Sequence, residues 1–196
     1  MNTLPLSLIL PVYNDAAALA AFLPELTAWL ASQARAEIIV VDDGSRDDVR
    51  AVCTAAVLPE NVVLRLLTLS RNFGKEAALS AGLQAARGEA VAMMDADGQH
   101  PVAVLAEMLA LHHQGADMVA AVQAKRDHEN RLLGFLKRGF YHFMQDGSRY
   151  ALTPDAGDFR VMGRKVVAAL LALPERQRFM KGLYAWVGFK TVYLPF

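Results

Sequence analysis

Short apolar runs alternate along the chain with segments in which apolar positions follow a helical spacing. Ile38, Ile39, Val40 and Val41 form one continuous apolar run, which is typical of a strand buried on both faces. The apolar runs predict strands at residues 6–13, 37–42, 62–69, 90–94 and 118–122. The segments between them predict helices at residues 16–30, 47–56, 75–86 and 102–114.

This order of strands and helices predicts a single α/β domain with a mostly parallel sheet and right-handed crossovers. Asp15 and Ser45 stand where helix N-caps are expected. In such sheets ligands bind beyond the carboxyl ends of the strands. Polar residues gather at four of these ends, namely residues 13–15, 42–45, 70–72 and 95–97. We therefore expect the functional site at this edge of the sheet.

The pattern changes after residue 124. Residues 132–144 predict an amphipathic helix with interspersed basic and aromatic side chains, which fits either an interfacial helix or one that packs on the core. A strand is expected at 159–162, a helix at 164–173, a helical segment at 179–186 and a strand at 190–194. The change divides the predicted domain into two parts, residues 1–124 and residues 125–196.

Composition narrows the class of protein. The chain has 196 residues, of which 54% are hydrophobic, and this content argues against disorder. Cys53 is the single cysteine, so it forms no internal disulfide, and we expect it in the core. The first residues do not resemble a signal peptide, and no stretch reaches the ~18 apolar residues of a membrane span. We expect this chain alone to be soluble or peripheral.

Charge is unevenly distributed although the net charge is zero. Residues 1–124 carry 7 Lys or Arg against 14 Asp or Glu, a net −7, whereas residues 125–196 carry 13 against 6, a net +7. The split suggests that the second part faces an anion, such as a phosphate or a lipid surface. Two ordinary solvated faces are the alternative.

Asp95 and Asp97 follow the apolar run 90–94. In an extended segment, residues two apart point the same way, so both carboxylates are expected to face one point above the sheet. Two like charges so close repel unless a cation lies between them. Hard divalent cations take oxygen ligands, and one cation can be bound by carboxylates and a diphosphate together. The side chain of Gln99 offers a further oxygen. A turn with solvated aspartates is the alternative.

Asp42 and Asp43 end another strand, where a carboxylate can accept hydrogen bonds from a base or a ribose. Gly44 allows a tight turn there. Lys75 opens a helix, where its charge opposes the helix dipole, and this mismatch suggests a nearby anion. Dinucleotide-binding, P-loop and zinc signatures are absent from the sequence.

Six stretches together resemble family 2 glycosyltransferases of the inverting GT-A fold, in particular the polyprenyl-phosphate glycosyltransferases. They are residues 11–15, 41–45, 72–76, 95–101, 157–160 and 174–182, and they occur in order over essentially the whole chain. The resemblance implies a GT-A fold and transfer of a sugar from a nucleotide sugar, a UDP-sugar such as UDP-glucose, to a polyprenyl phosphate. It also implies that residues 1–124 form a nucleotide-sugar-binding half and residues 125–196 an acceptor-binding half. Relatives continue past the position of Phe196 into a basic segment, amphipathic helices and often transmembrane helices.

The resemblance also implies roles for individual residues. The nucleotide-sugar contacts are expected at Pro11, Tyr13, Asp15, Val41, Asp42, Asp43, Lys75, Asp95, Ala96, Asp97 and Arg126. Asp95, Asp97 and Gln99 are expected to hold Mg²⁺ or Mn²⁺, which neutralises charge on the leaving diphosphate. We expect a membrane-surface partner at the cytoplasmic face of the cell membrane for the full-length protein, no nucleic-acid partner, and leave a homo-oligomer open.

For the chemical step, Asp97 acts through the metal and Asp158 is the candidate base or acceptor-orienting carboxylate. A salt bridge is the alternative for Asp158. The acceptor phosphate is expected at Arg160, Arg176 and Arg178, since arginine grips such oxygens with paired hydrogen bonds. The rival interpretations are a soluble family 2 transferase with a saccharide acceptor and a catalytically silent nucleotide-sugar-binding domain. A haloacid-dehalogenase phosphatase is disfavoured, because Gln99 stands where its motif has threonine.

Overall fold

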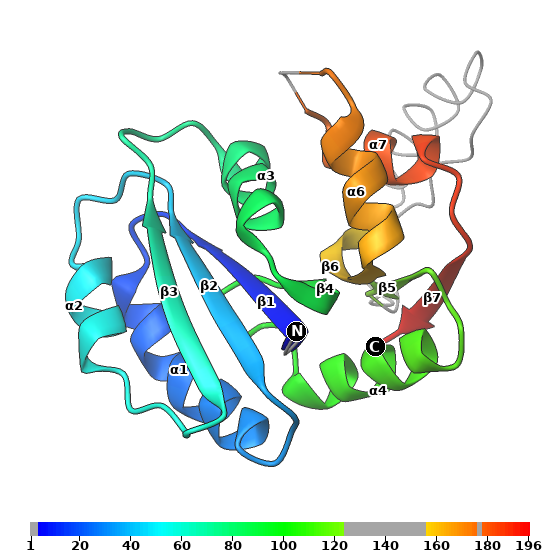
Figure 1. Ribbon diagram of the computed structural model, residues 1–196. Helices are drawn as coiled ribbons and strands as arrows, with labels where there is room; N and C mark the ends of the chain where they lie inside the picture. The colour runs from blue at the N-terminus through cyan, green and yellow to red at the C-terminus, as the bar shows by residue number, and fades with distance from the viewer. Residues whose placement is uncertain (1–3, 124–155, 176–177) are drawn as a thin grey trace, which may run out of the picture.

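The computed structural model describes residues 4–123, 156–175 and 178–196, which form one α/β domain (Figure 1). The strands are β1 (Leu4–Val12), β2 (Ala36–Asp42), β3 (Val62–Thr68), β4 (Gly88–Met93), β5 (Met118–Val122), β6 (Ala156–Gly163) and β7 (Thr191–Pro195). The helices are α1 (Ala16–Leu30), α2 (Val49–Ala55), α3 (Lys75–Ala85), α4 (Val102–His113), α6 (Arg164–Ala172) and α7 (Met180–Trp186). The predicted order of elements is confirmed within these residues, and the helix expected at 132–144 lies outside them.

The strands pair in the order β3-β2-β1-β4-β6-β5-β7. The first four are parallel, as the alternating pattern predicts, and β7 runs parallel to β5. β6 departs from this rule, because it is antiparallel to both β4 and β5. The sheet is therefore mostly parallel, and strands from both predicted halves of the chain interleave within it.

Two helical layers cover the sheet. α1, α2 and α4 pack on one face and α3, α6 and α7 on the other (Figure 1). A hydrophobic core lies on each face of the sheet. Ile38 and Val40 of β2 pack in the core under α1, α2 and α4, and Ile39 and Val41 pack in the core under α3, α6 and α7. All seven residues of β2 are buried, which explains its continuous apolar run. Cys53 lies in the first of these two cores as predicted, and burial raises the pKa of its thiol to about 11.

The approach of α3 to the sheet depends on Gly82. A Cβ at this position would lie 2.4 Å from Cγ2 of Ile9 on β1, so only glycine allows this packing distance. The contact fixes the axis of α3 and hence the place of its first residue, Lys75. The first turn of α3 is thereby brought to the carboxyl edge of the sheet.

Of the two predicted N-caps, Asp15 has the expected position without the capping hydrogen bond, and Ser45 is wrong. Asp15 occupies the cap position of α1, but its side chain makes no capping hydrogen bond, and Asp47 accepts from the Ala16 N–H at 2.7 Å instead. Asp48, rather than Ser45, caps α2 by accepting from the Ala51 N–H at 3.0 Å. Sequence position alone did not show which acidic side chain reaches which helix.

A buried polar cluster ties the sheet together at its opposite edge. Glu37, 1% exposed, accepts from the Ser7 hydroxyl at 2.6 Å, the Arg87 N–H at 2.7 Å and Arg65 Nη1 at 2.9 Å. Burial on its own would raise the pKa of Glu37, but these hydrogen bonds outweigh it and the pKa is lowered. The cluster joins β1, β2 and β3 to the start of β4.

Within the described ranges, none of the helices combines the length and the hydropathy that crossing a bilayer requires.

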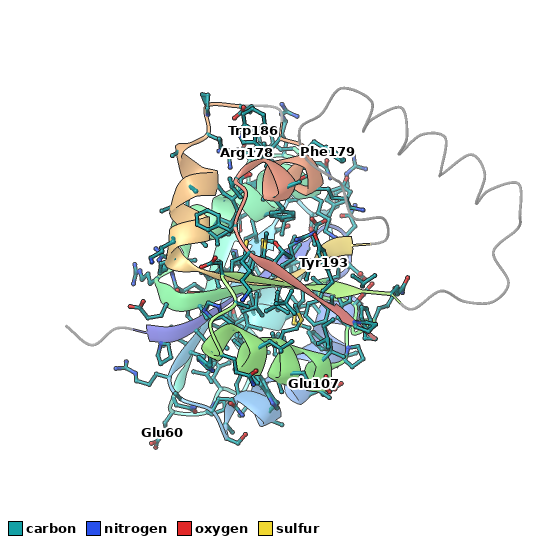
Figure 2. All side chains as sticks on the ribbon, turned by 90° about the vertical axis from the view of Figure 1, so that its right-hand side faces the viewer. Glu60, Glu107, Arg178, Phe179, Trp186 and Tyr193 are labelled. Atoms are coloured by element: carbon teal, nitrogen blue, oxygen red, sulfur yellow. The ribbon has the colours of Figure 1, made fainter. Side chains whose placement is uncertain are left out.

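Glu37→Gln should destabilise the fold by about 1.5–3 kcal/mol at pH 7, because it removes the charge from a buried set of hydrogen bonds. The lowered pKa means that the stabilisation is present above pH ~4.5 and is lost as pH falls through the folded-state pKa. Urea unfolding across pH 3–7 measures both effects. The control is Glu60→Gln, since Glu60 projects from the surface (Figure 2). Equal stability of the two variants at pH 7 would contradict this account.

Candidate functional site

The loops after β1 and β2 are joined by hydrogen bonds at the carboxyl edge of the sheet. The Asn14 N–H donates to the Ser45 hydroxyl at 3.0 Å, and the Arg46 N–H donates to Asn14 Oδ1 at 2.8 Å. Asn14 has a φ of 52°, a left-handed conformation that asparagine tolerates. Tyr13 and Asp15 beside it are exposed. These two side chains are therefore accessible where the resemblance expects a nucleotide.

Asp43 joins the loop after β2 to the loop after β3. It is 3% exposed, and its carboxylate accepts from the Phe73 N–H and the Gly74 N–H, each at 2.8 Å. Gly44 has a φ of 73°, and a Cβ there would lie 2.4 Å from the backbone of Arg71. The structure thus gives Asp43 a loop-clamping role in addition to the nucleotide contact that the sequence predicts.

Asp42 and two apolar positions of the predicted contact set are also turned inward. Asp42 is 8% exposed and accepts from the Ser45 N–H at 2.8 Å. The side chains of Val41 and Ala96 are buried in the core, at 0% and 5% exposure. Only backbone atoms of Val41 and Ala96 are left for a ligand. Pro11 is half-buried at the end of β1.

Lys75, Asp95 and Asp158 meet although they lie on α3, the loop after β4 and β6. The Lys75 ammonium lies 2.5 Å from Asp95 Oδ1 and 3.7 Å from Asp158 Oδ2. Burial would lower the pKa of Lys75, but the two carboxylates outweigh it and raise the pKa, so the ammonium is charged at neutral pH. The anion that the sequence placed near Lys75 is thus, in this structure, the protein's own pair of carboxylates.

Asp97 lies in a turn rather than in the extended segment that the sequence predicts. β4 ends at Met93, and Asp97 Oδ1 accepts from the Gln99 N–H at 2.9 Å within the turn. Asp97 and Gln99 are exposed, whereas Asp95 is half-buried. The two aspartates therefore do not share a direction through strand alternation. They share the loop, and Asp97 is the more accessible ligand.

His100 connects the loop after β4 to β6. Its Nδ1 accepts from the Asp95 N–H at 3.2 Å, and its ring lies against Phe159 at a centroid distance of 4.5 Å. Burial lowers the pKa of His100 against the opposing charges of Asp95 and Asp97, so the ring is neutral at pH 7. Sequence reasoning assigned His100 no role, although it lies within the 95–101 motif.

Arg160, which the sequence predicts at the acceptor phosphate, is buried in this structure and its guanidinium is engaged by the protein. It is 4% exposed, and its guanidinium lies 4.2 Å from the centre of the Tyr184 ring. Its Nε donates to the Gly157 carbonyl at 3.0 Å and its Nη1 to Met118 Sδ at 3.5 Å. Strand alternation puts Arg160 on the α7 side of β6, where helix packing excludes solvent.

Tyr184 and Glu76 connect α7 to the carboxylates. The Tyr184 hydroxyl donates to Asp158 Oδ1 at 3.5 Å, and burial raises the pKa of Tyr184 well above its ordinary value, so the hydroxyl stays protonated. Glu76 Oε2 accepts from the Met180 N–H, the first of α7, at 3.1 Å. Sequence reasoning missed both residues. The sequence could have drawn attention to Glu76, because it is adjacent to Lys75 within the stretch 72–76.

Arg178 has most of its guanidinium engaged by backbone carbonyls. Its Nε donates to Glu175 O at 3.2 Å and its Nη2 to Leu173 O at 3.1 Å. Its Nη1 is buried and has no hydrogen-bond partner among the described residues. Arg178 lines a groove of about 670 Å³ between α3 and the end of α6, near α7 (Figure 2). Arg126 and Arg176 lie outside the described residues.

A larger groove, of about 830 Å³, lies between α1 and α2. Its lining, which includes Leu23, Thr27, Ala55 and Val57, is mainly apolar and contains none of the predicted site residues. The larger groove therefore does not coincide with the predicted site, which lies at the polar loops of the carboxyl edge.

The donor set at this edge fits a divalent cation that is shared with a ligand. Mg²⁺ and related hard cations are commonly held by one or two carboxylates plus phosphate oxygens. Asp95 and Asp97 supply two carboxylates, and a cation already lies against Asp95, namely the Lys75 ammonium. Among the described residues, no group of three or more His, Cys, Asp or Glu side chains is assembled to hold a metal without further ligands.

The fold and the polar edge define a GT-A type of glycosyltransferase domain. The sequence profile of Glycosyl transferase family 2 matches residues 7–171, and the chain belongs to this family. The chain is 39% identical over 195 residues to an uncharacterized glycosyltransferase of Synechocystis sp., covering 99% of this chain and 61% of that protein. It is 36% identical over 187 residues to a prophage bactoprenol glucosyl transferase homolog of Escherichia coli K12, covering 95% of this chain and 61% of that protein.

The chain thus spans about three fifths of the length of these relatives. Solved structures show the same fold. A mannosyltransferase of Pyrobaculum calidifontis, in complex with GDP-Man and Mn²⁺, superposes with a TM-score of 0.67 at 23% identity, over 99% of this chain and 56% of that one. Glucosyl-3-phosphoglycerate synthase of Mycobacterium tuberculosis, in complex with Mn²⁺, UDP and its product, gives 0.64 at 20% identity, over 97% and 70%.

Asp43→Asn should destabilise the domain by about 1–3 kcal/mol, because the new amide NH₂ faces a backbone N–H that loses its acceptor. Urea unfolding measures the change, and UDP titration measures whether binding follows. The control is Glu60→Gln, since Glu60 is exposed and belongs to none of the predicted contacts (Figure 2). Unchanged stability together with weakened UDP binding would instead make Asp43 a nucleotide ligand alone.

Proposed function

We propose that the full-length protein is an inverting glycosyltransferase that moves a sugar from a nucleotide sugar to a polyprenyl phosphate. UDP-glucose is the first donor candidate. Lipid transfer places the reaction at a membrane surface, and we propose the cytoplasmic face of the cell membrane. Family membership and the relatives named as bactoprenol glucosyl transferases support this proposal.

The single observation that carries the proposal is the meeting of Asp95 and Asp158 across one ammonium. Asp95 is the residue predicted to face the donor diphosphate, and Asp158 comes from a different strand, β6. Their common partner is the Lys75 ammonium, which lies 2.5 Å from Asp95 Oδ1 and 3.7 Å from Asp158 Oδ2. A carboxylate is thereby positioned beside the predicted donor, where a transferase needs a group that handles the acceptor.

The residues divide the work as follows. Asp95 and Asp97 would hold Mg²⁺ or Mn²⁺, which supplies charge neutralisation on the leaving diphosphate. Asp158 orients the acceptor, and it accepts the proton of the minority of phosphate that is still protonated near neutral pH. The Tyr184 hydroxyl fixes the direction of Asp158. Tyr13 and Asp15 remain accessible for the nucleotide.

A phosphate acceptor suits this site because its oxygen is already ionised. A hydroxyl acceptor requires a base to remove its proton, whereas a phosphate requires chiefly alignment and charge compensation. Of the arginines expected at this anion, Arg176 lies outside the described residues, and Arg178 has one nitrogen, Nη1, without a hydrogen-bond partner among them. Both stay in the proposal as acceptor contacts.

The test incubates the full-length protein with UDP-glucose, other UDP- and GDP-sugars, a polyprenyl phosphate and Mg²⁺ or Mn²⁺. Mass spectrometry detects the glycosyl phospholipid. Asp97→Ala should lower turnover by about 100-fold or more, since metal-borne charge stabilisation is worth several kcal/mol. Glu107→Gln, an exposed change on α4, should leave turnover unaltered (Figure 2).

Two results would contradict the proposal. One is turnover that survives both Asp97→Ala and chelation of the metal. The other is transfer to a water-soluble saccharide with none to the lipid phosphate, which would favour the saccharide-acceptor alternative. Donor binding without any transfer by the full-length protein would favour the catalytically silent alternative.

A further inference from the structure

Lys75 occupies an unusual electrostatic position. Its Nζ is 2.5 Å from Asp95 and 3.7 Å from Asp158, while its side chain is 43% exposed. Among the residues that the structure describes, Lys75 is the cation that forms an ion pair with either carboxylate. Its charge therefore compensates two acidic groups that come from different strands.

We propose that Lys75 is the internal counter-ion of the site, which stands against Asp95 in the donor-free protein and turns to Asp158 when a divalent cation takes Asp95. The inference rests on the proposed function, because it requires that a cation and a donor bind at Asp95 and Asp97. It makes Lys75 a positioning residue that acts through Asp95 and Asp158. It also replaces the prediction that Lys75 contacts the donor.

Electrostatics requires the exchange. An ammonium 2.5 Å from a carboxylate oxygen and a divalent cation on the same carboxylate repel one another strongly, so metal binding displaces the lysine. Asp158 is the nearest alternative partner, at 3.7 Å. The four-carbon stem of lysine is flexible enough for this small turn.

The surroundings keep the backbone still while the side chain turns. Gly82 packs α3 directly against Ile9, and Glu76 ties the first turn of α3 to the Met180 N–H. Asp158 is held by the Tyr184 hydroxyl, whose ring is covered by Arg160. Asp158 is also the less exposed carboxylate, with 17% of its side chain accessible against 36% for Asp95. The exposed partner is thus the one open to exchange.

The exchange couples the cation to the donor. Before the donor arrives, Lys75 weakens cation binding at Asp95, so a metal ion without phosphate oxygens is held loosely. Once both have bound, the released ammonium pairs with Asp158 and keeps that carboxylate ionised and oriented beside the acceptor.

The test is Mn²⁺ binding, measured by titration calorimetry or electron paramagnetic resonance on the full-length protein, with and without UDP. Lys75→Gln should bind Mn²⁺ about 5- to 20-fold more tightly than wild type without UDP, because the competing charge is gone and the pair is partly screened by solvent. Lys181→Gln, which removes a charge on α7, should change the affinity by less than about twofold. Lys75→Arg, which keeps the charge, should stay close to wild type.

A second arm separates this inference from a donor contact. UDP binding without metal should be unchanged in Lys75→Gln, whereas a loss of about tenfold or more would make Lys75 a phosphate ligand and overturn the inference. If Lys75→Gln fails to fold, the same measurements are made on Lys75→Met, which keeps an unbranched apolar side chain.

The outcomes also distinguish the two proposals. If wild type binds Mn²⁺ together with UDP, and Lys75→Gln matches Lys181→Gln in Mn²⁺ affinity, the counter-ion role is wrong while the proposed function stands. If wild type binds no Mn²⁺ even with UDP, both are wrong. Tighter Mn²⁺ binding confined to Lys75→Gln and Lys75→Met supports the counter-ion role.

Discussion

Compensation of negative charge at the carboxyl edge of the sheet is the constraint on which the site depends. Strand ends bring several carboxylates to this edge, and each needs a partner. Asp42 and Asp43 obtain theirs from backbone N–H groups of adjoining loops. Asp95 and Asp158 share the Lys75 ammonium, and Asp158 also accepts from the Tyr184 hydroxyl. The type of partner therefore separates the acidic residues that hold loops in place, Asp42 and Asp43, from those proposed to act on ligands, Asp95 and Asp158.

This separation explains how a rigid scaffold carries a responsive site. Carboxylates bound to backbone groups fix the loops after β1, β2 and β3, because breaking them would leave buried groups unpaired. A carboxylate bound to a flexible, half-exposed lysine can exchange its partner without disturbing the fold. The tight packing of α3 at Gly82 and the contact between Glu76 and α7 hold the backbone on both sides of the exchange.

Much of the fold was predictable from the sequence, because apolar runs and helical spacing report burial directly. The strands of the parallel half and all helices among the described residues fall close to their expected places. The direction of β6 was not predicted, because it depends on the path of the chain between β5 and β6 and on pairing with β4 and β5. The capping hydrogen bonds expected from Asp15 and Ser45 are absent, because loop geometry decides which side chain reaches a helix N-terminus.

The site was predictable in outline but not in its contacts. The motif at residues 95–101 located the loop, yet its turn gives Asp95 and Asp97 different partners. The burial of Arg160 was not predicted, because residue type suggests phosphate binding while strand alternation buries the guanidinium beside Tyr184. Tyr184 was missed, since its contact with Asp158 joins residues that no local pattern connects.

Anomalous diffraction from crystals of the protein grown with Mn²⁺ and UDP tests the central claim most directly. The account predicts one manganese peak at the carboxyl edge, bonded to the carboxylates of Asp95 and Asp97 and to both phosphates of UDP. Bound UDP with no manganese peak beside it, or a peak held by other side chains, would contradict the account.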